Sequence, residues 1–231
     1  MTARRDRPLR IQVGESHAVS CLFERPRCAR AVLVLAHGAG AGMAHPSMQS
    51  MAHRLADRGV ATLRYQFPYM ERGSRRPDPP ALCHATVRAA VAAAARLAPQ
   101  LPLAAGGRSF GGRMTSQAQA ESPLPRVRGL AFLAFPLHPA ARPGIDRAAH
   151  LQAIGIPMLF IQGTRDELAQ LPLLRPVIAR LGSRATLHLL EGADHSFHVP
   201  ARSGRKDFEV QADALDALCD WLDRLDRSRG D

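Results

Sequence analysis

The chain has 231 residues and a mass of 25.0 kDa, with 46% hydrophobic and 22% charged residues. This balance is typical of a globular protein and excludes a wholly disordered or fibrous chain. The 31 basic and 20 acidic residues leave a formal net charge of +11, which raises a nucleic-acid binder as an alternative. Aromatic residues make up only 5%, and no run of five or six like charges occurs, so we do not expect a nucleic-acid partner.

The apolar segments and the cysteines bear on the compartment. No apolar run approaches the roughly 18 residues of a membrane span, and residues 1–20 lack the apolar core of a secretory signal. The cysteines form no CxxC pair and have no metal-ligand spacing with histidine. We therefore expect a cytoplasmic protein with separate thiols, no metal site and no membrane partner. The four cysteines are Cys21, Cys28, Cys83 and Cys219.

The first thirty residues predict an edge of a sheet. Two apolar runs, 9–13 and 18–23, flank a short turn and are typical of an antiparallel hairpin. From residue 31 onward, short apolar runs alternate with helical patterns, as in βα units around a parallel sheet. The strands expected there are 31–36, 60–65, 101–107, 127–135, 157–163 and 185–192. The expected helices are those around 48–55, from 80 to 97, from 109 onward, 168–181 and 207–225.

The segment 67–80 shows no periodicity and predicts a loop. At its end, Asp78 precedes two prolines and is expected to cap the following helix. No internal repeat or low-complexity linker divides the chain. We therefore expect one α/β domain over residues 1–231, with edge strands in 1–30 and the core in 31–225.

A glycine-rich segment carries the candidate nucleophile. Gly107-Arg108-Ser109-Phe110-Gly111 fits the pattern GxSxG, which by itself is a weak signal. Here an apolar strand precedes the pattern, a helical segment follows it, and a further glycine stands at each end. A nucleophile elbow needs this context, because the serine sits in a strained turn and only glycines let strand and helix approach closely.

A serine hydroxyl also needs a base and a group that orients the base. Asp166 follows the strand expected at 157–163, and His195 follows the strand expected at 185–192. Because the carboxyl ends of parallel strands meet at one edge of the sheet, both side chains can converge on Ser109. A helix cap is the alternative role of Asp166, and His198 is the competing base.

The negative charge of a tetrahedral intermediate requires fixed N–H donors. The first expected donor is the amide of Phe110, the residue after the nucleophile. The segment His37-Gly38-Ala39-Gly40 resembles an HG-type oxyanion loop, so the amide of Ala39, or failing that of Gly40, is the second. A phosphate-binding loop is the alternative interpretation, but the segment lacks the GK[ST] ending.

The runs AHGAGAGMAHPSM, LRYQFPYMERGSRRPD and GGRSFGGRM resemble those of α/β-hydrolases. They are similar to a subfamily of small, mostly uncharacterised hydrolases related to dienelactone hydrolase, which includes hydrolase-like domains of a testis-expressed protein and of a chromatin-complex subunit. The resemblance implies a three-layer sandwich with a mostly parallel sheet and an antiparallel N-terminal edge hairpin. Dienelactone hydrolase itself has a cysteine nucleophile where this chain has Ser109, so its substrate is not carried over.

No long insertion follows the strand expected at 127–135, so no large lid is expected, and the segments 67–80 and 136–153 are left to cover the site. We expect a serine hydrolase that cleaves small ester or related acyl substrates through an acyl-enzyme intermediate without a cofactor. Since some relatives are parts of assemblies, a non-catalytic hydrolase-like interaction module is the alternative. A homodimer is compatible with the sequence.

Several side chains are candidates for binding the small-molecule substrate. Arg108 lies inside the elbow motif, and three further arginines lie in the covering loop. Guanidinium groups pair well with planar anions, so an anionic substrate is one expectation, with solvent exposure an equal alternative for the loop arginines. Tyr69 and His37 are the other candidates, with ordinary packing the alternative for Tyr69. The loop arginines are Arg72, Arg75 and Arg76.

Overall fold

The computed structural model describes residues 6–227, in which eight strands form one sheet in the order β1-β2-β4-β3-β5-β6-β7-β8. The strands are β1 (Arg7–Val13), β2 (His17–Glu24), β3 (Ala31–Ala36), β4 (Val60–Tyr65), β5 (Leu103–Arg108), β6 (Val127–Leu133), β7 (Met158–Gly163) and β8 (Ala185–Leu190). The pairs β1–β2 and β2–β4 are antiparallel, and every pair from β4 to β8 is parallel. A mostly parallel sheet with an N-terminal antiparallel hairpin is thereby confirmed.

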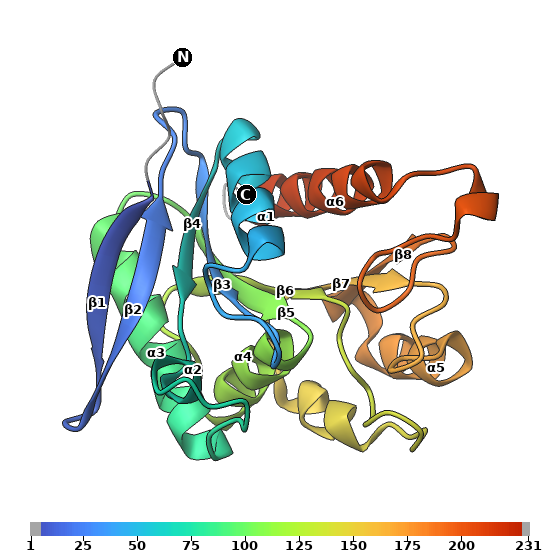
Figure 1. Cartoon of the computed structure of the whole chain (residues 1–231), viewed down its shortest axis with the longest axis horizontal. Helices are drawn as coiled ribbons and strands as arrows, with labels where there is room; N and C mark the ends of the chain where they lie inside the picture. Colours follow the sequence, from blue (N-terminus) through green and yellow to red (C-terminus); the bar gives the residue numbers. More distant parts are fainter. Residues whose placement is uncertain (1–5, 228–231) are drawn as a thin grey trace.

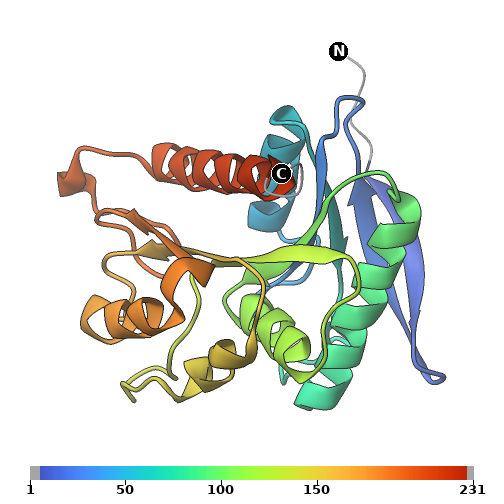
Figure 2. The same ribbon diagram turned by 180° about the vertical axis from the view of Figure 1, so that it is seen from behind.

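Helices cover both faces of this sheet (Figures 1 and 2). The α-helices are α1 (Pro46–Asp57), α2 (Pro68–Glu71), α3 (Pro80–Leu97), α4 (Phe110–Glu121), α5 (Leu171–Leu181) and α6 (Asp207–Arg227). The 3-10 helices are η1 (Asp146–Ala153), η2 (Gly182–Arg184) and η3 (Ala201–Ser203). Figure 1 shows α1 and α6 above the sheet and α3, α4, α5 and η1 below it, which gives the three layers.

The alternation of side chains along β3 explains why two helical layers form. Val32 and Val34 pack with the helices of one layer, and Leu33 and Leu35 pack with α1 and α6 on the other side. Successive side chains of a strand point to opposite faces, so a strand that is apolar throughout requires cover on both. All six residues of β3 are buried.

The segment expected to be a loop at 67–80 contains the short helix α2, and the predicted capping role of Asp78 is wrong. The residue before α3 is Pro79, and no side chain caps that helix. Instead, the Asp78 carboxylate accepts a hydrogen bond of 2.6 Å from the Tyr69 N–H and pairs with Arg72. Helix α2 brings both donors to the carboxylate, so it is not available to α3.

Three further predictions can be compared with the described residues: the absence of a large lid after β6, the start of α5 and the absence of a membrane-spanning helix. Between β6 and β7, the chain forms only the short helix η1, which confirms that no large lid is inserted there. Helix α5 starts at Leu171, three residues later than expected, because the Leu168 N–H donates to the Asp166 carboxylate in a preceding turn. No helix within residues 6–227 is both long enough and apolar enough to cross a membrane.

Candidate active site

Ser109 sits at the tight turn between β5 and α4. Its backbone has φ 48° and ψ −115°, a conformation that a residue with a side chain adopts only at a cost. The Ser109 N–H donates to the Leu133 carbonyl at 2.9 Å, which ties the turn to β6. A Cβ atom added to Gly107 would lie 2.6 Å from the Ala36 carbonyl oxygen, so glycine is required for β3 and the turn to approach. The turn therefore has the geometry of a nucleophile elbow.

The side chains of Ser109, His195 and Asp166 form one hydrogen-bonded chain. The His195 Nε2 lies 2.8 Å from the Ser109 Oγ, and the His195 Nδ1 lies 2.7 Å from the Asp166 Oδ2. A carboxylate accepts hydrogen bonds, so Nδ1 carries the ring proton and Nε2 is left to accept the proton of the serine hydroxyl. The structure thus brings together three residues that follow three different strands, as their positions in the sequence predict.

Gln162 in β7 supports Asp166 and was not predicted. Its side chain is fully buried; its Nε2 donates to the Asp166 Oδ2, and its Oε1 accepts a hydrogen bond of 2.9 Å from the Phe135 N–H. The other carboxylate oxygen of Asp166 accepts the Leu168 N–H at 2.8 Å. Both oxygens are therefore held in place. A glutamine inside an otherwise apolar strand was the signal in the sequence, because a buried amide needs partners.

Arg108 holds the loop that carries His195. Its Nη2 donates to the His195 carbonyl at 3.2 Å, and its guanidinium lies 5.2 Å from the centroid of the Phe197 ring. Burial lowers the pKa of Arg108, and the carboxylates of Asp194 and Asp166 oppose this effect. Arg108 also lines a cavity beside Ser109, but much of its hydrogen-bonding and stacking capacity is used within the protein.

The competing base, His198, lies outside the chain of hydrogen bonds at Ser109. Its ring is exposed, and its Nδ1 lies 2.8 Å from the Asp207 carboxylate, a bond that raises the pKa of His198. The Asp194 carboxylate shapes the turn in between, since it accepts the N–H groups of Ser196 at 2.7 Å and His198 at 3.0 Å. This turn separates the two histidines, so that only His195 reaches the serine.

The amide of Phe110 meets the geometric requirement for an oxyanion donor. Phe110 is the first residue of α4, and the N–H of a first helical residue has no carbonyl one turn earlier to bind. The positive end of the α4 dipole lies at the same place. A negatively charged oxygen bound beside Ser109 would therefore lie near both the Phe110 N–H and the positive end of the α4 dipole.

The loop after β3 presents its amides because its carbonyl groups are held from behind. The Gly38 carbonyl accepts a hydrogen bond of 2.7 Å from the His37 Nδ1, and the Ala39 carbonyl accepts one of 2.9 Å from the Tyr69 hydroxyl. In a trans peptide, the C=O and N–H groups point in opposite directions. These two bonds therefore set the directions of the N–H groups of Ala39 and Gly40, both of which border the cavity at Ser109.

His37 and Tyr69 do not line the substrate space, contrary to expectation. Both side chains are fully buried, and neither borders the cavities that reach Ser109 within the described chain. The His37 Nε2 accepts the Phe67 N–H at 3.1 Å, so both ring nitrogens are bonded to backbone groups. The His37 and Tyr69 side chains lie behind the loop that follows β3 and hold its peptide groups. Tyr69 reaches this position because it belongs to α2, which packs against the back of the loop.

The buried ring of His37 predicts a loss of stability in mild acid. Burial lowers the pKa of His37 to about 4, below the ordinary value near 6.5. As the pH falls from about 6.5 to about 4, the unfolded chain takes up a proton that the folded protein refuses, so the free energy of unfolding decreases by about 3 kcal/mol. Above about pH 6.5, where His37 is neutral in both states, its contribution to the free energy of unfolding is fully present. Urea unfolding at a series of pH values measures it.

The variant His37→Gln isolates this effect. Glutamine also offers an N–H donor group and an acceptor oxygen, but it does not titrate in this range. We expect the dependence of the unfolding free energy on pH between 7 and 4 to become clearly weaker in the variant. His150, whose pKa is also lowered to about 4 by burial and by the charge of Arg113, keeps its own contribution. A variant curve parallel to the wild-type curve would show that His37 is not responsible.

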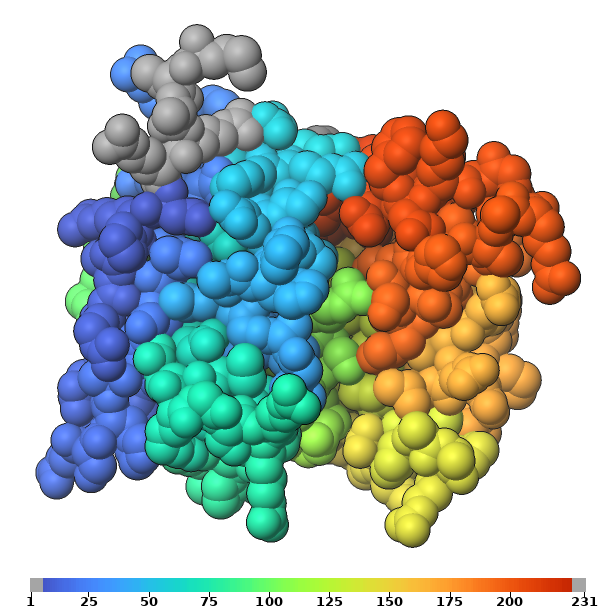
Figure 3. All heavy atoms as spheres, viewed as in Figure 1, coloured from blue at the N-terminus to red at the C-terminus, as the bar shows by residue number. Residues whose placement is uncertain are grey.

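Two cavities meet at Ser109, and Ala39 also borders both. The first has a volume of about 450 Å³ and lies between α1 and α6, with His195 on its wall. Its apolar lining includes Met48, Met51, Leu133, Ala214 and Leu215. In the space-filling view, green atoms of the chain near residue 110 are visible in a recess between the blue region of α1 and the orange and red regions (Figure 3).

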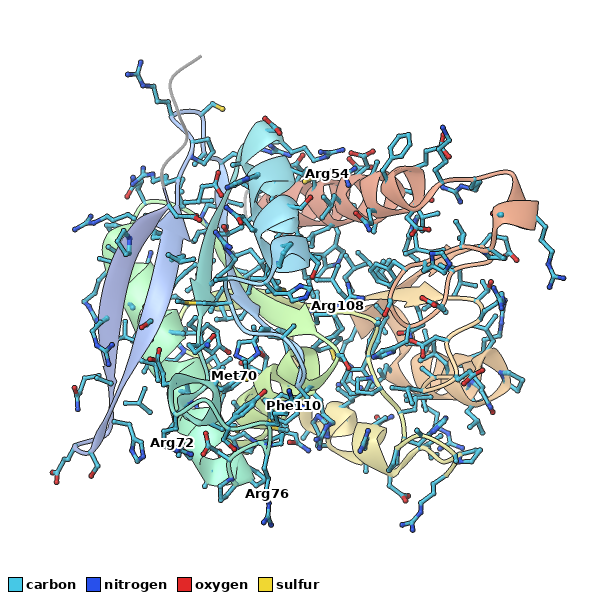
Figure 4. All side chains as sticks on the ribbon, viewed as in Figure 1. Arg54, Met70, Arg72, Arg76, Arg108 and Phe110 are labelled. Carbon is cyan, nitrogen blue, oxygen red and sulfur yellow. The ribbon has the colours of Figure 1, made fainter. Side chains whose placement is uncertain are left out.

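The second cavity has a volume of about 440 Å³ and lies on the other side of Ser109, beside the start of α4. The two segments expected to cover the site do border it, through Pro77 and Asp78 from one and Pro136 and Arg147 from the other. Figure 4 shows Phe110 at the start of α4, below Arg108, with Arg54 farther away on α1.

The loop arginines do not line either cavity. Arg72 pairs with Asp78, and Arg75 and Arg76 are exposed. In Figure 4, the Arg76 side chain points away from the body of the molecule. The expectation that these arginines contact a substrate is therefore not met in this structure, because α2 and the turn after it direct them to solvent.

Comparison with known proteins agrees with this architecture. A structure of an α/β serine hydrolase homologue from Coxiella burnetii superposes with a TM-score of 0.74 at 20% identity, over 94% of this chain and 100% of that one. A dienelactone hydrolase from Anabaena variabilis has a TM-score of 0.71 at 19% identity, over 96% of both chains. A protein from Xanthomonas campestris, described as a serine hydrolase without a lid, has a TM-score of 0.73 at 19% identity, over 96% of this chain and 97% of that one.

At these identities the solved structures show a shared fold. The family comparison goes further, because the model described as "Alpha/beta hydrolase domain" matches residues 29–223, a stretch that includes Ser109, Asp166 and His195. With the sheet order, the elbow and most of the chain in agreement, this protein belongs to the α/β hydrolase domain family.

Proposed function

We propose that the protein is a serine hydrolase that cleaves small esters or related acyl compounds through an acyl-enzyme intermediate. One observation carries the proposal, namely the hydrogen-bonded chain from the Ser109 Oγ through the His195 ring to the buried Asp166 carboxylate. The serine at its end borders two cavities of the size that small substrates occupy. A non-catalytic module would have no need for a strained serine bonded to a histidine.

In the first half of the reaction, the Ser109 Oγ attacks the carbonyl carbon while the His195 Nε2 accepts the hydroxyl proton. Asp166 keeps the imidazole in the required tautomer and stabilises its positive charge. The amides of Phe110 and Ala39, with Gly40 as the alternative, stabilise the oxyanion. His195 then donates its proton to the leaving oxygen, the carbon–oxygen bond breaks, and the acyl group remains on Ser109.

In the second half, water takes the place of the leaving group. The His195 Nε2 accepts a proton from water, the resulting hydroxide attacks the acyl carbon, and a second tetrahedral intermediate forms. When it collapses, the proton returns to the Ser109 Oγ and the acid departs. Neither half requires a metal or an organic cofactor, since side chains and backbone amides supply every proton transfer and charge.

Within the family, we propose that this chain belongs with the small hydrolases related to dienelactone hydrolase and works in the cytoplasm as one domain. The likeness in fold to a dienelactone hydrolase over 96% of the chain supports the first part. The lack of paired cysteines in the sequence supports a reducing compartment.

Labelling with a fluorophosphonate probe tests the proposed function. We expect the folded protein to gain one adduct, located on Ser109 by mass spectrometry of peptides, because the probe reacts with activated serines. Ser109→Ala should abolish the adduct. Ser122→Ala, which changes an exposed serine at the other end of α4, is the matched control and should be labelled like the wild type. Folded protein that the probe leaves unmodified would favour the non-catalytic module instead.

A further inference from the structure

The second cavity at Ser109 is lined by two arginines that the proposed reaction does not use. Arg113 follows the nucleophile by one turn of α4, and its guanidinium lies 5.7 Å from the centroid of the Phe110 ring. Arg147 comes from η1 on the opposite side, and its Nη1 donates to the His138 carbonyl at 2.9 Å. Two cationic side chains from distant parts of the sequence therefore face one space beside the nucleophile.

Neither guanidinium has a carboxylate partner in the described chain. No carboxylate within residues 6–227 forms an ion pair with either guanidinium, and the Arg113 Nε is buried without a hydrogen-bond partner there. Asp78 is the only acidic residue among those that line the cavity, and Arg72 and the Tyr69 N–H already occupy its carboxylate.

Burial and mutual repulsion both act on this pair. Burial lowers the pKa of Arg113 and of Arg147, and the charge of Arg147 lowers the pKa of Arg113 further. Both side chains are partly buried, and a partly buried charge without a counter-ion lowers the stability of the folded protein. A bound anion would remove this cost by accepting hydrogen bonds from both guanidinium groups. Arg108 differs from this pair, because the carboxylates of Asp194 and Asp166 already oppose the effect of burial on its pKa.

We propose that this cavity binds a carboxylate at the far end of the substrate's acyl chain, so that the preferred substrates are monoesters of dicarboxylic acids. This inference rests on the proposed hydrolase function. A planar carboxylate suits guanidinium groups, which present their N–H donors in a fixed fork. An acyl chain bound at Ser109 would enter the cavity past Phe110 and end between Arg113 and Arg147.

The position of His195 decides which part of the ester occupies which cavity. The leaving oxygen must lie within reach of the His195 Nε2 to receive its proton. His195 borders the first cavity and not the second, so the alcohol leaves on the side of the first cavity. An uncharged alcohol can pack there against Met48, Met51 and Leu215. The same cavity is bordered by Arg54, which donates to the Gln211 side chain and the Phe208 carbonyl, and by Arg108. The acyl group then lies in the cavity of Arg113 and Arg147.

Two esters that differ only in the acyl terminus test this inference. Mono-p-nitrophenyl adipate ends in a carboxylate where p-nitrophenyl hexanoate ends in a methyl group, and the leaving group is the same. We expect kcat/KM of the wild type to be about 10- to 100-fold higher for the adipate ester, the range that a charged hydrogen bond provides. Equal values, or a preference for hexanoate, would overturn the carboxylate site while leaving the hydrolase intact.

Substitution of one arginine locates the effect. Arg147→Gln should lower the adipate-to-hexanoate ratio of kcat/KM by about 10-fold or more, and Arg147→Lys should restore part of it because the charge returns. Arg142→Gln removes an equal charge from an exposed position in the segment before η1 and should leave the ratio unchanged. A ratio that falls equally in Arg142→Gln and Arg147→Gln would show a general effect of net charge and contradict the site.

Binding without turnover separates this inference from the proposed function. In Ser109→Ala, isothermal titration should show tighter binding of the adipate ester than of the hexanoate ester, and Arg147→Gln in that background should abolish the difference. If neither ester is hydrolysed by the wild type but the difference in binding persists, the hydrolase proposal fails and the carboxylate site stands. If the esters bind equally, the carboxylate site fails whatever the activity.

Discussion

Replacing Ser109 or His195 by alanine is expected to lower kcat for an activated ester by about 10⁵- to 10⁶-fold. Ser109 is the only serine bonded to the His195 Nε2 among the described residues, at 2.8 Å, so no other hydroxyl can take over the attack. Because the two residues act as one unit, the double variant should be no slower than either single variant. Stopped-flow and steady-state measurements with p-nitrophenyl hexanoate provide the rates.

Asp166→Asn should reduce kcat by about 10⁴-fold while the protein remains folded. An asparagine keeps one acceptor oxygen, so its NH2 must face either the Leu168 N–H at the Oδ1 position or the His195 Nδ1–H and the Gln162 amide at the Oδ2 position. The second arrangement favours the imidazole tautomer that cannot accept the serine proton, and both arrangements remove the negative charge that stabilises the imidazolium. Circular dichroism and the unfolding midpoint show whether the fold persists.

His198→Ala is the matched control for these variants. His198 belongs to the same loop as His195, but its exposed ring is bonded to Asp207 and should contribute less than about 3-fold to kcat. The assignment of the base would be wrong if His198→Ala removed activity and His195→Ala did not. Equal losses in both would point instead to a collapse of the loop.

Gly111→Ala is expected to affect both stability and activity, although position 111 contacts no substrate in the proposed reaction. A Cβ atom there would lie 2.5 Å from the His37 carbonyl oxygen and 2.7 Å from the Ala36 Cβ. Because α4 and the end of β3 cannot both keep their places, the loop that begins at His37 must shift. We expect the free energy of unfolding to fall by about 1 to 3 kcal/mol, as for other overpacked interiors.

The same shift should lower kcat by about 100-fold, because the amides of Ala39 and Gly40 move relative to Ser109. Gly155→Ala is the control, since no atom lies within 4 Å of the added Cβ and the residue has no positive φ. It should change stability by less than about 1 kcal/mol and leave kcat unaltered. Wild-type stability and activity in Gly111→Ala would mean that this contact does not position the loop.

The order of strands and helices was predictable because it depends on local patterns. The apolar run at 31–36 can be buried only if both faces of the strand are covered, and the structure covers both. The glycines around Ser109 likewise predict a close approach of strand and helix. By contrast, α2 has four residues, too few for a helical periodicity, and its presence follows from contacts with Asp78.

The candidate triad was predictable from one topological rule, since residues that follow parallel strands gather at one edge of the sheet. The residues that support it were not. Gln162 donates to Asp166 and is itself held by the N–H of a loop residue, Phe135, and Tyr69 in α2 donates to the Ala39 carbonyl. The contacts with Phe135 and Ala39 join residues about thirty positions apart, and no spacing rule connects them.

The amino-acid sequence by itself determined an arginine-rich α/β protein with a serine in a glycine-bounded turn. It could not determine which arginines are available to a ligand, because charge pairing depends on the segments that packing brings together. The fold assigns Arg72 to Asp78 and Arg108 to the His195 carbonyl. It leaves Arg113 and Arg147 without carboxylate partners in the described chain, and they face a cavity beside the serine. The tertiary structure, which sets the partners of each arginine, therefore determined where an anion can bind.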